Sequence, residues 1–219
     1  MRRRQLSAAL SHEPDLAVVI AGMNDTLRGE FATTRLVEDL DVVVGALTAT
    51  GAHVILARLH DHTRLVPLPR VWRRALRERL AEVNAAVDVV AMRYRALCVD
   101  LNTLPRVYAR ESWSIDRFHP SELGHRHLAA GFAAVAEQAG WQIARPVSLE
   151  CEGGRPTMRL DQARWLIGAG VPWLGRRSRD LLPLAASLLV REVLPGAPRM
   201  PHPPGPTTPV TVPEPSVSS

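Results

Sequence analysis

The sequence predicts an α/β fold with a parallel sheet, and two features of its hydrophobic pattern indicate this. Three short apolar runs are rich in β-branched residues, and each precedes a longer segment whose apolar residues recur every three or four positions. Alternation of strand and helix is typical of parallel sheets joined by right-handed crossovers. A third feature supports a folded core, because hydrophobic residues make up 46% of the 219 residues.

The first predicted strand, residues 16–21, begins after Pro14 and ends at Gly22. Because this run is apolar throughout, we expect it to be buried on both faces of the sheet. The helix that follows ends at Gly51, and glycine favours the position just beyond a helix C-terminus. Its apolar stripe comprises Leu36, Leu40, Val43 and Leu47.

Two more strand–helix units follow along the chain. The second strand is predicted at residues 53–57, and it precedes a long amphipathic helix over residues 70–95. The third strand is predicted at residues 97–101. Ser121 is the expected N-cap of the last helix, which ends near Gly140.

The composition divides the chain into three parts. Residues 1–143 contain the alternating pattern and form the predicted α/β domain. Residues 144–194 begin as an irregular connection and continue as short apolar segments, which predicts a helical extension. We expect its part at 160–194 to pack back on the domain or to contact a partner protein. Residues 195–219 are rich in Pro, Thr, Ser and Val and should be disordered or polyproline-like.

Charge and cysteine content narrow the possible partners and compartments. All 27 basic residues are arginines, which indicates the coding bias of a GC-rich bacterial gene, so the arginines at 70–79 are read as a solvated helix face. Aromatic residues are only 5%, which argues against a nucleic-acid platform. We expect no membrane contact, because the chain has no apolar run long enough to span a bilayer. Two cysteines cannot form a disulfide framework, which predicts a cytoplasmic protein.

Histidines near the predicted strand ends are candidate metal ligands. The loop at residues 60–64 reads His-Asp-His-Thr-Arg, while His125 and His127 lie two positions apart on the last predicted helix. Residues two apart point to different faces of a helix, and no second spaced pair of ligands follows. The sequence therefore predicts no metal site and no cofactor, and the loop at 60–64 is expected to line a substrate crevice.

Two short motifs have the residue types that acyl transfer requires. Gly22-Met23-Asn24-Asp25 follows the first strand, and the segment 116–120, Asp-Arg-Phe-His-Pro, precedes the last helix. Both fall beyond the carboxyl ends of strands, where open parallel sheets bind ligands. A carboxylate three residues before a histidine can fix its tautomer, and a glycine N–H with an asparagine amide can stabilise an oxyanion.

These two motifs, in this order, resemble those of the SGNH (GDSL-type) hydrolases. The resemblance covers residues 5–140 and includes Gly124-His125, which follow the second motif at the family's spacing. It implies a flavodoxin-like three-layer α/β/α fold and hydrolysis of a small-molecule ester or acylated substrate by a Ser-His-Asp triad. Within that triad His119 is the implied base and Asp116 orients it, while Gly22 and Asn24 are the implied oxyanion-hole donors.

The chain departs from the family at the nucleophile. It contains no Gly-Asp-Ser motif, and Ser7, Ser11, Ser112 and Ser114 do not follow a strand at a tight turn. The resemblance implies that the family's first two strands are missing, so the strand at 16–21 should have an unpaired edge that only the segment 181–194 is placed to cover. We therefore expect an enzyme that is inactive as written; the alternative is a non-catalytic α/β binding or scaffold module.

Overall fold

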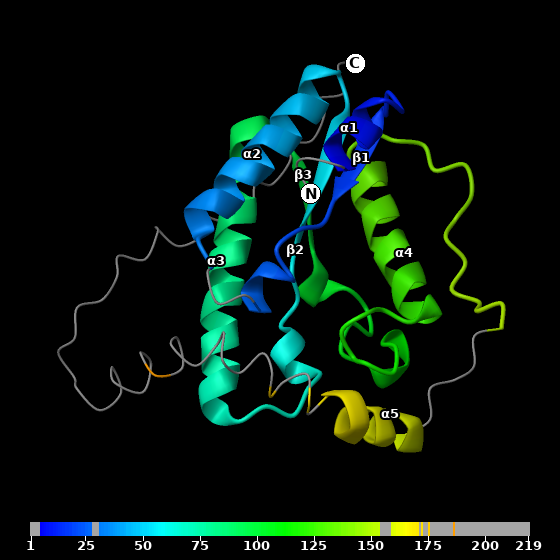
Figure 1. Cartoon of the computed structure of the whole chain (residues 1–219). Coiled ribbons are helices and arrows are strands. Elements are labelled where there is room, and N and C mark those ends of the chain that lie inside the picture. Colours follow the sequence, from blue (N-terminus) through cyan, green and yellow to red (C-terminus); the bar gives the residue numbers. More distant parts are fainter. Residues whose placement is uncertain are drawn as a thin grey trace, which may run out of the picture.

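Three parallel strands lie between two layers of helices, which confirms the predicted three-layer α/β class (Figure 1). The structure is a computed structural model that describes residues 5–27, 31–153 and 159–170, with Pro172, Gly175 and Ala186. The strands are β1 (Leu16–Val19), β2 (His53–Arg58) and β3 (Leu97–Asp100), in the order β1-β2-β3. Their pairing aligns Val18 with Ile55 and Leu56 with Cys98.

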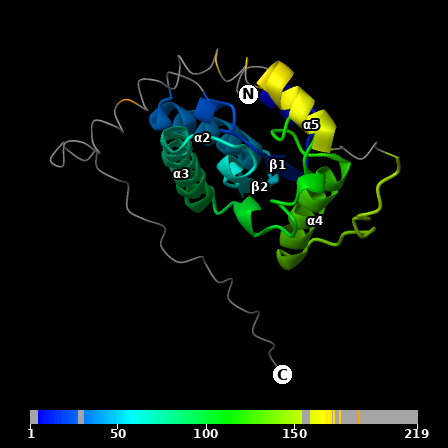
Figure 2. The same cartoon turned by 90° about the horizontal axis from the view of Figure 1, so that it is seen from below.

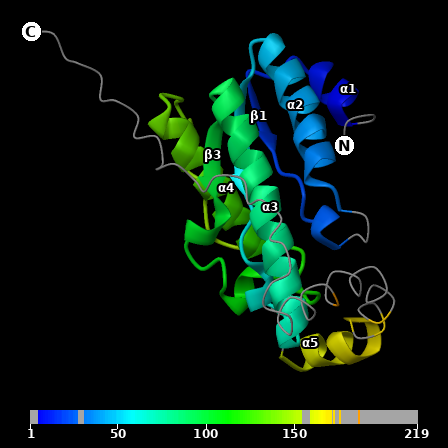
Figure 3. The ribbon, with the colours of Figure 1, turned by 90° about the vertical axis from the view of Figure 1, so that its left-hand side faces the viewer.

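Helices cover the two faces of the sheet unequally. The pair α2 (Thr33–Ala49) and α3 (Arg70–Tyr94) covers one face, and α4 (Glu122–Gln138) packs on the other (Figures 1 and 2). The short α1 (Gln5–Leu10) lies beside α2 (Figure 3). Beyond the carboxyl ends of the strands lies α5 (Arg159–Trp165), which continues as a π-helical turn over Leu166–Gly170.

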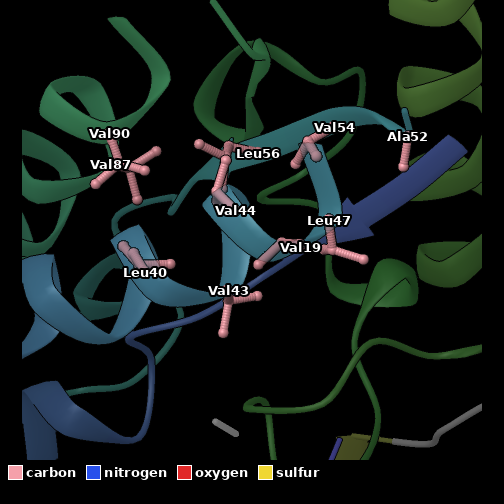
Figure 4. Packing of buried hydrophobic residues seen from close by; sticks show 10 residues of the cluster. All are labelled: Val19, Leu40, Val43, Val44, Leu47, Ala52, Val54, Leu56, Val87 and Val90. Carbon is pink, nitrogen blue, oxygen red and sulfur yellow. The ribbon is translucent and has the colours of Figure 1, made fainter. Parts of the chain in front are cut away.

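The predicted apolar stripes form the core. Residues of α2, α3, β1 and β2 make one cluster, which Figure 4 shows in detail: Val19, Leu40, Val43, Val44, Leu47, Ala52, Val54, Leu56, Val87 and Val90. A second cluster joins β2 and β3 to α4, where Leu128, Phe132 and Val135 pack against it. Because β2 is central, its side chains enter both clusters, and Ile55 and Leu56 are fully buried.

The first strand is less buried than its sequence predicts. Val19 is buried in the α2 layer, but Val18 and Ile20 are 46% and 45% exposed. Successive side chains of a strand point to opposite faces, and α4 packs on β3 rather than on β1. The expectation that this strand is buried on both faces was therefore wrong. In the part of the chain that the structure describes, β1 pairs only with β2, so it is an edge strand. Apart from Ala186, the segment proposed as its cover, 181–194, lies outside the described residues, as does the tail at 195–219.

The parallel direction of the strands places both motifs beyond the carboxyl end of the sheet. All three strands run in the same direction, so the loops that follow them gather at their carboxyl ends, which form the lower part of Figure 1. Short 3₁₀ turns follow β1 at Asp25–Leu27 and β2 at His62–Arg64. Among the described residues, no helix is both long and apolar enough to cross a membrane.

Candidate active site

Asp116 and His119 are in direct contact. The loop that carries them is closed by a bridge between Trp113 and Pro120 and by the Ser114 N–H, which donates to the His119 carbonyl at 2.9 Å. His119 Nδ1 lies 2.6 Å from Asp116 Oδ2. The histidine side chain is 80% exposed while the aspartate side chain is 21% exposed. A protonated Nδ1 that donates to this carboxylate leaves Nε2 as the proton-accepting nitrogen.

The carboxylate of Asp116 is held by donors on both of its oxygens. Oδ1 accepts hydrogen bonds from the Ser114 hydroxyl at 2.6 Å and from the backbone N–H groups of Phe118 and His119, each at 2.9 Å. Partial burial alone would raise the pKa of Asp116. The donors from His119, Ser114 and Phe118 outweigh burial and lower that pKa to about 2. Asp116 is therefore ionised and fixed in orientation near neutral pH.

The first motif forms a tight turn that requires glycine. Gly22 has φ +96°, and a Cβ at this position would lie 2.4 Å from Val83 Cγ1 on α3. Its carbonyl accepts from the N–H groups of Asp25 and Thr26 at 3.0 and 3.1 Å. Asn24, which lies between Gly22 and Asp25 in this turn, is exposed. The turn thus brings the chain close to α3 and leaves the Asn24 amide accessible at the sheet edge.

A buried arginine supports this turn from α3. Arg79 is only 6% exposed, and its Nη1 donates to the Thr26 carbonyl at 3.0 Å. Its assignment to a solvated helix face was therefore wrong. The signal was present in the spacing, because Arg79 lies three residues after Leu76 and four before Val83, on the apolar stripe itself.

The two motifs are attached to the same apolar cluster. Leu27, the last residue of the turn that begins at Asp25, is buried with Leu68 and Leu76. Phe118, next to His119, packs against this cluster. Arg117 ties the same loop to the segment after β2, because its Nη1 donates to the Leu65 carbonyl at 3.0 Å. Both motifs therefore lie at the same end of the sheet, beyond the carboxyl ends of the strands.

The two histidines of the loop after β2 are buried, contrary to the expectation that this loop lines an open crevice, and of residues 60–64 only Arg64 is exposed. His60 and His62 are 4% and 1% exposed, and the His60 ring lies 4.7 Å from the Trp113 ring, between centroids. Burial, with a smaller contribution from His62, lowers the pKa of His60 to about 4, and burial also lowers the pKa of His62. Across the described ranges, no group of three or more His, Cys, Asp or Glu side chains is arranged to hold a metal ion.

Polar side chains that the sequence analysis did not single out hold this loop in place. Asn84 on α3 accepts from the Leu59 N–H at 2.7 Å and donates to the Leu59 carbonyl at 3.0 Å. The Asp61 N–H donates to the Tyr108 hydroxyl at 3.0 Å and to Asn102 Oδ1 at 3.1 Å. The only available signal was the position of Asn84, next to Val83 on the buried face of its helix.

The serines nearest to the Asp116–His119 pair have other partners. Ser112 is 3% exposed and its hydroxyl donates to the Arg106 carbonyl at 2.9 Å, while the Ser114 hydroxyl donates to Asp116. Ser121 caps α4 as predicted, because its hydroxyl accepts from the Gly124 N–H at 3.2 Å. Gly124 is required for packing, since a Cβ there would lie 2.0 Å from the Ser112 carbonyl oxygen.

Comparison with known proteins gives a family match. The profile of the GDSL-like lipase/acylhydrolase family matches residues 1–127, which is more than half of the chain and includes both motifs. Searches among curated proteins and among solved structures gave no match. The parallel three-layer fold and the ordered pair of motifs agree with this match. The chain therefore belongs to the GDSL-like lipase/acylhydrolase family.

Proposed function

We propose that this chain forms the base and oxyanion part of a serine-type acyl-ester hydrolase site. His119 is the general base, Asp116 orients it, and the Gly22 N–H with the Asn24 amide stabilises the oxyanion. The observation that carries the proposal is the 2.6 Å contact between His119 Nδ1 and Asp116 Oδ2, beside an imidazole that is 80% exposed. The proposed substrate is a small-molecule ester or acylated compound.

The proposed reaction proceeds through a tetrahedral intermediate. His119 Nε2 takes the proton of a serine hydroxyl as its oxygen attacks the ester carbonyl, and Asp116 stabilises the imidazolium that forms. The carbonyl oxygen becomes an oxyanion that accepts hydrogen bonds from Gly22 and Asn24. His119 then protonates the departing alkoxide, and an acyl-serine remains. His119 and Asp116 next activate a water molecule that hydrolyses this acyl-serine.

We propose that alone this chain does not turn over, because the two serines nearest to the Asp116–His119 pair have other partners. No Gly-Asp-Ser motif is present, and the hydroxyls of Ser112 and Ser114 donate to acceptors other than His119. A triad without its nucleophile retains at most the weak acceleration that the oxyanion hole and binding provide. This lack favours the second candidate, a non-catalytic module with the same fold whose segment 160–194 contacts a partner protein.

The tautomer of His119 tests the base assignment without requiring turnover. In the full chain labelled with ¹⁵N-histidine, neutral His119 should show a protonated Nδ1 and an unprotonated Nε2. Asp116→Asn should shift this preference, because an amide can donate a hydrogen bond to Nδ1. Asp15→Asn, at an exposed aspartate beyond the opposite end of β1, is the matched control and should leave the tautomer unchanged. Predominant Nε2 protonation in the wild-type chain would refute the assignment.

Reaction with activated reagents tests the missing nucleophile. We expect no burst of p-nitrophenol from p-nitrophenyl acetate and no covalent labelling by a serine-directed fluorophosphonate. Stoichiometric labelling that maps to Ser7, Ser112 or Ser114 would contradict this expectation and show that the site rearranges to present a serine. A wild-type His119 tautomer as expected, together with absent labelling, would support a site that lacks only its nucleophile.

A further inference from the structure

Trp113 anchors the loop that carries Asp116 and His119. This tryptophan is 6% exposed, and its Nε1–H donates to the Val107 carbonyl at 2.6 Å. Its backbone forms the bridge with Pro120 that closes the loop. The placement of the Trp113 ring therefore helps to determine where this loop leaves the domain.

The Trp113 ring packs on a histidine from the loop after β2. The ring centroids of His60 and Trp113 lie 4.7 Å apart, with an angle of 41° between the ring planes. The rings of His62 and Tyr108 lie 6.4 and 6.3 Å from that of His60, again between centroids. These four side chains, which we call the ring cluster, join the loop after β2 to the segment after β3.

The ring cluster accommodates a neutral His60 but not a charged one. His60 is 4% exposed, and its Nε2 is buried without a hydrogen-bond partner among the described residues. A protonated imidazole has an N–H on both ring nitrogens, and a buried charge costs more free energy than a buried neutral group. Protonation therefore favours any arrangement that exposes His60 to water.

Charged groups around the ring cluster do not remove this cost. Burial is the largest cause that lowers the pKa of His60, to about 4, and His62 lowers it further, while Asp61 acts in the opposite direction. The Asp61 carboxylate also accepts from Arg77 Nε of α3 at 2.8 Å, so its charge is shared. The Arg64 guanidinium, 3.6 Å from the centre of the tyrosine ring, adds a positive charge beside the cluster.

The β2 side of the contact is held independently of Trp113. Asn84 on α3 accepts from the Leu59 N–H at 2.7 Å and donates to the Leu59 carbonyl at 3.0 Å, one residue before His60. Leu59 is 1% exposed and belongs to the cluster that joins β2 and β3 to α4. The sheet therefore does not depend on the contact between His60 and Trp113.

The loop side of the contact has its own internal bonds and side-chain ties to other segments. The Ser114 N–H donates to the His119 carbonyl at 2.9 Å, within the loop. Arg117 Nη1 donates to the Leu65 carbonyl at 3.0 Å, and Phe118 packs against the cluster after β1. Because these ties are side-chain contacts at the sheet end, the loop can open without breaking the strand ladder.

We propose that neutral His60 is a positioning residue for the loop of Asp116 and His119, and that its protonation releases Trp113 and this loop while the sheet stays folded. The loop carries the candidate base, so the site is assembled near neutral pH and opens in acid. As a form of regulation, this inference rests on the proposed hydrolase function.

Hydrogen exchange of the full chain at pH 7.5 and pH 5.0 measures the release of Trp113. Its indole N–H is the reporter, because it is buried and bonded only while the ring is packed. His60 has a pKa of about 4 in the closed loop and of 6.5 when exposed, so the opening equilibrium rises about thirtyfold between these pH values. The indole protection factor should fall at least that much and stay below those of the β2 amides.

Two histidine variants make a matched pair. His60→Phe keeps a ring against Trp113 but cannot be protonated, so its fall in protection should be at least about tenfold smaller than in the wild-type chain. His53→Phe is the control: His53 also packs on a tryptophan, Trp141, at 5.4 Å between centroids, but it is exposed and starts β2 at the opposite end. It should keep the wild-type response.

Three results would overturn the proposal. The first is an indole protection factor equal to those of the β2 amides at both pH values, since Trp113 would then be exposed only by global unfolding. This comparison uses the wild-type chain alone and does not depend on the folding of a variant. The second is an indole protection factor that does not change with pH.

The third contrary result is an equal fall in the wild-type chain and His60→Phe, or loss of the response in His53→Phe, which would assign the effect to general charge. Failure of the proposed function would appear separately, as the wrong His119 tautomer at pH 7.5, where the loop is closed. A correct tautomer with no release of Trp113 in acid would overturn only the present inference.

Discussion

Acid should destabilise this protein through the buried histidines of the loop after β2. His60 packs against the Trp113 ring and is 4% exposed, and His60 Nε2 is buried without a hydrogen-bond partner among the described residues. Burial and the neighbouring His62 lower the pKa of His60 to about 4, against 6.5 for a free histidine, although Asp61 acts in the opposite direction. The folded state therefore holds His60 neutral.

The sign and size of the effect follow from this difference in pKa. Above pH 6.5 both the folded and the unfolded states have a neutral His60, so the full stability is present. As the pH falls below 6.5 the unfolded chain binds a proton that the folded chain binds only near pH 4, and stability is lost. The limit for His60 is about 3 kcal/mol, and the loss at pH 5 is about 2 kcal/mol. His62, whose pKa is also lowered, adds to it.

Chemical denaturation at pH 7.5 and pH 5.0 measures this loss. The wild-type chain should lose about 2 kcal/mol or more of unfolding free energy, with a melting temperature about 4–8 °C lower. His60→Phe keeps a ring against Trp113 but cannot be protonated, so it should reduce the loss by about 2 kcal/mol. His12→Gln, at an exposed position, controls for the change in net charge. An equal pH dependence in the wild-type chain and His60→Phe would refute the reasoning.

Three further predictions concern the two motifs. Gly22→Ala should destabilise the fold by about 2–4 kcal/mol, because Gly22 has a positive φ and a Cβ there would meet Val83. In a double-mutant cycle measured by denaturation, Val83→Ala should recover about 1–2 kcal/mol of this loss. Ser114→Ala should raise the pKa of Asp116 towards its ordinary value, measured by ¹³C carboxyl titration, while Ser114→Thr should preserve it. Gly124→Ala should cost about 1–3 kcal/mol in thermal unfolding because its Cβ meets the Ser112 carbonyl; an unchanged melting temperature would show that this approach is not tight.

Local pattern was sufficient for the order of elements and for the contact between Asp116 and His119. Periodicity predicted the three strands and the helices to within two residues at most ends, because strand and helix periods are local properties of the chain. The Asp116–His119 contact was also predictable, since three residues at a helix entrance bring a carboxylate and an imidazole within reach. The family match over residues 1–127 includes both motifs.

Burial and charge balance, by contrast, were decided by the tertiary structure. Sequence alone assigned His60 to an open crevice and Arg79 to solvent. In the structure His60 is buried against Trp113, and Arg79 is buried against the turn after β1. The exposure of Val18 likewise depends on which strand α4 covers. These properties arise from contacts between segments far apart in the chain, and no local pattern encodes such contacts.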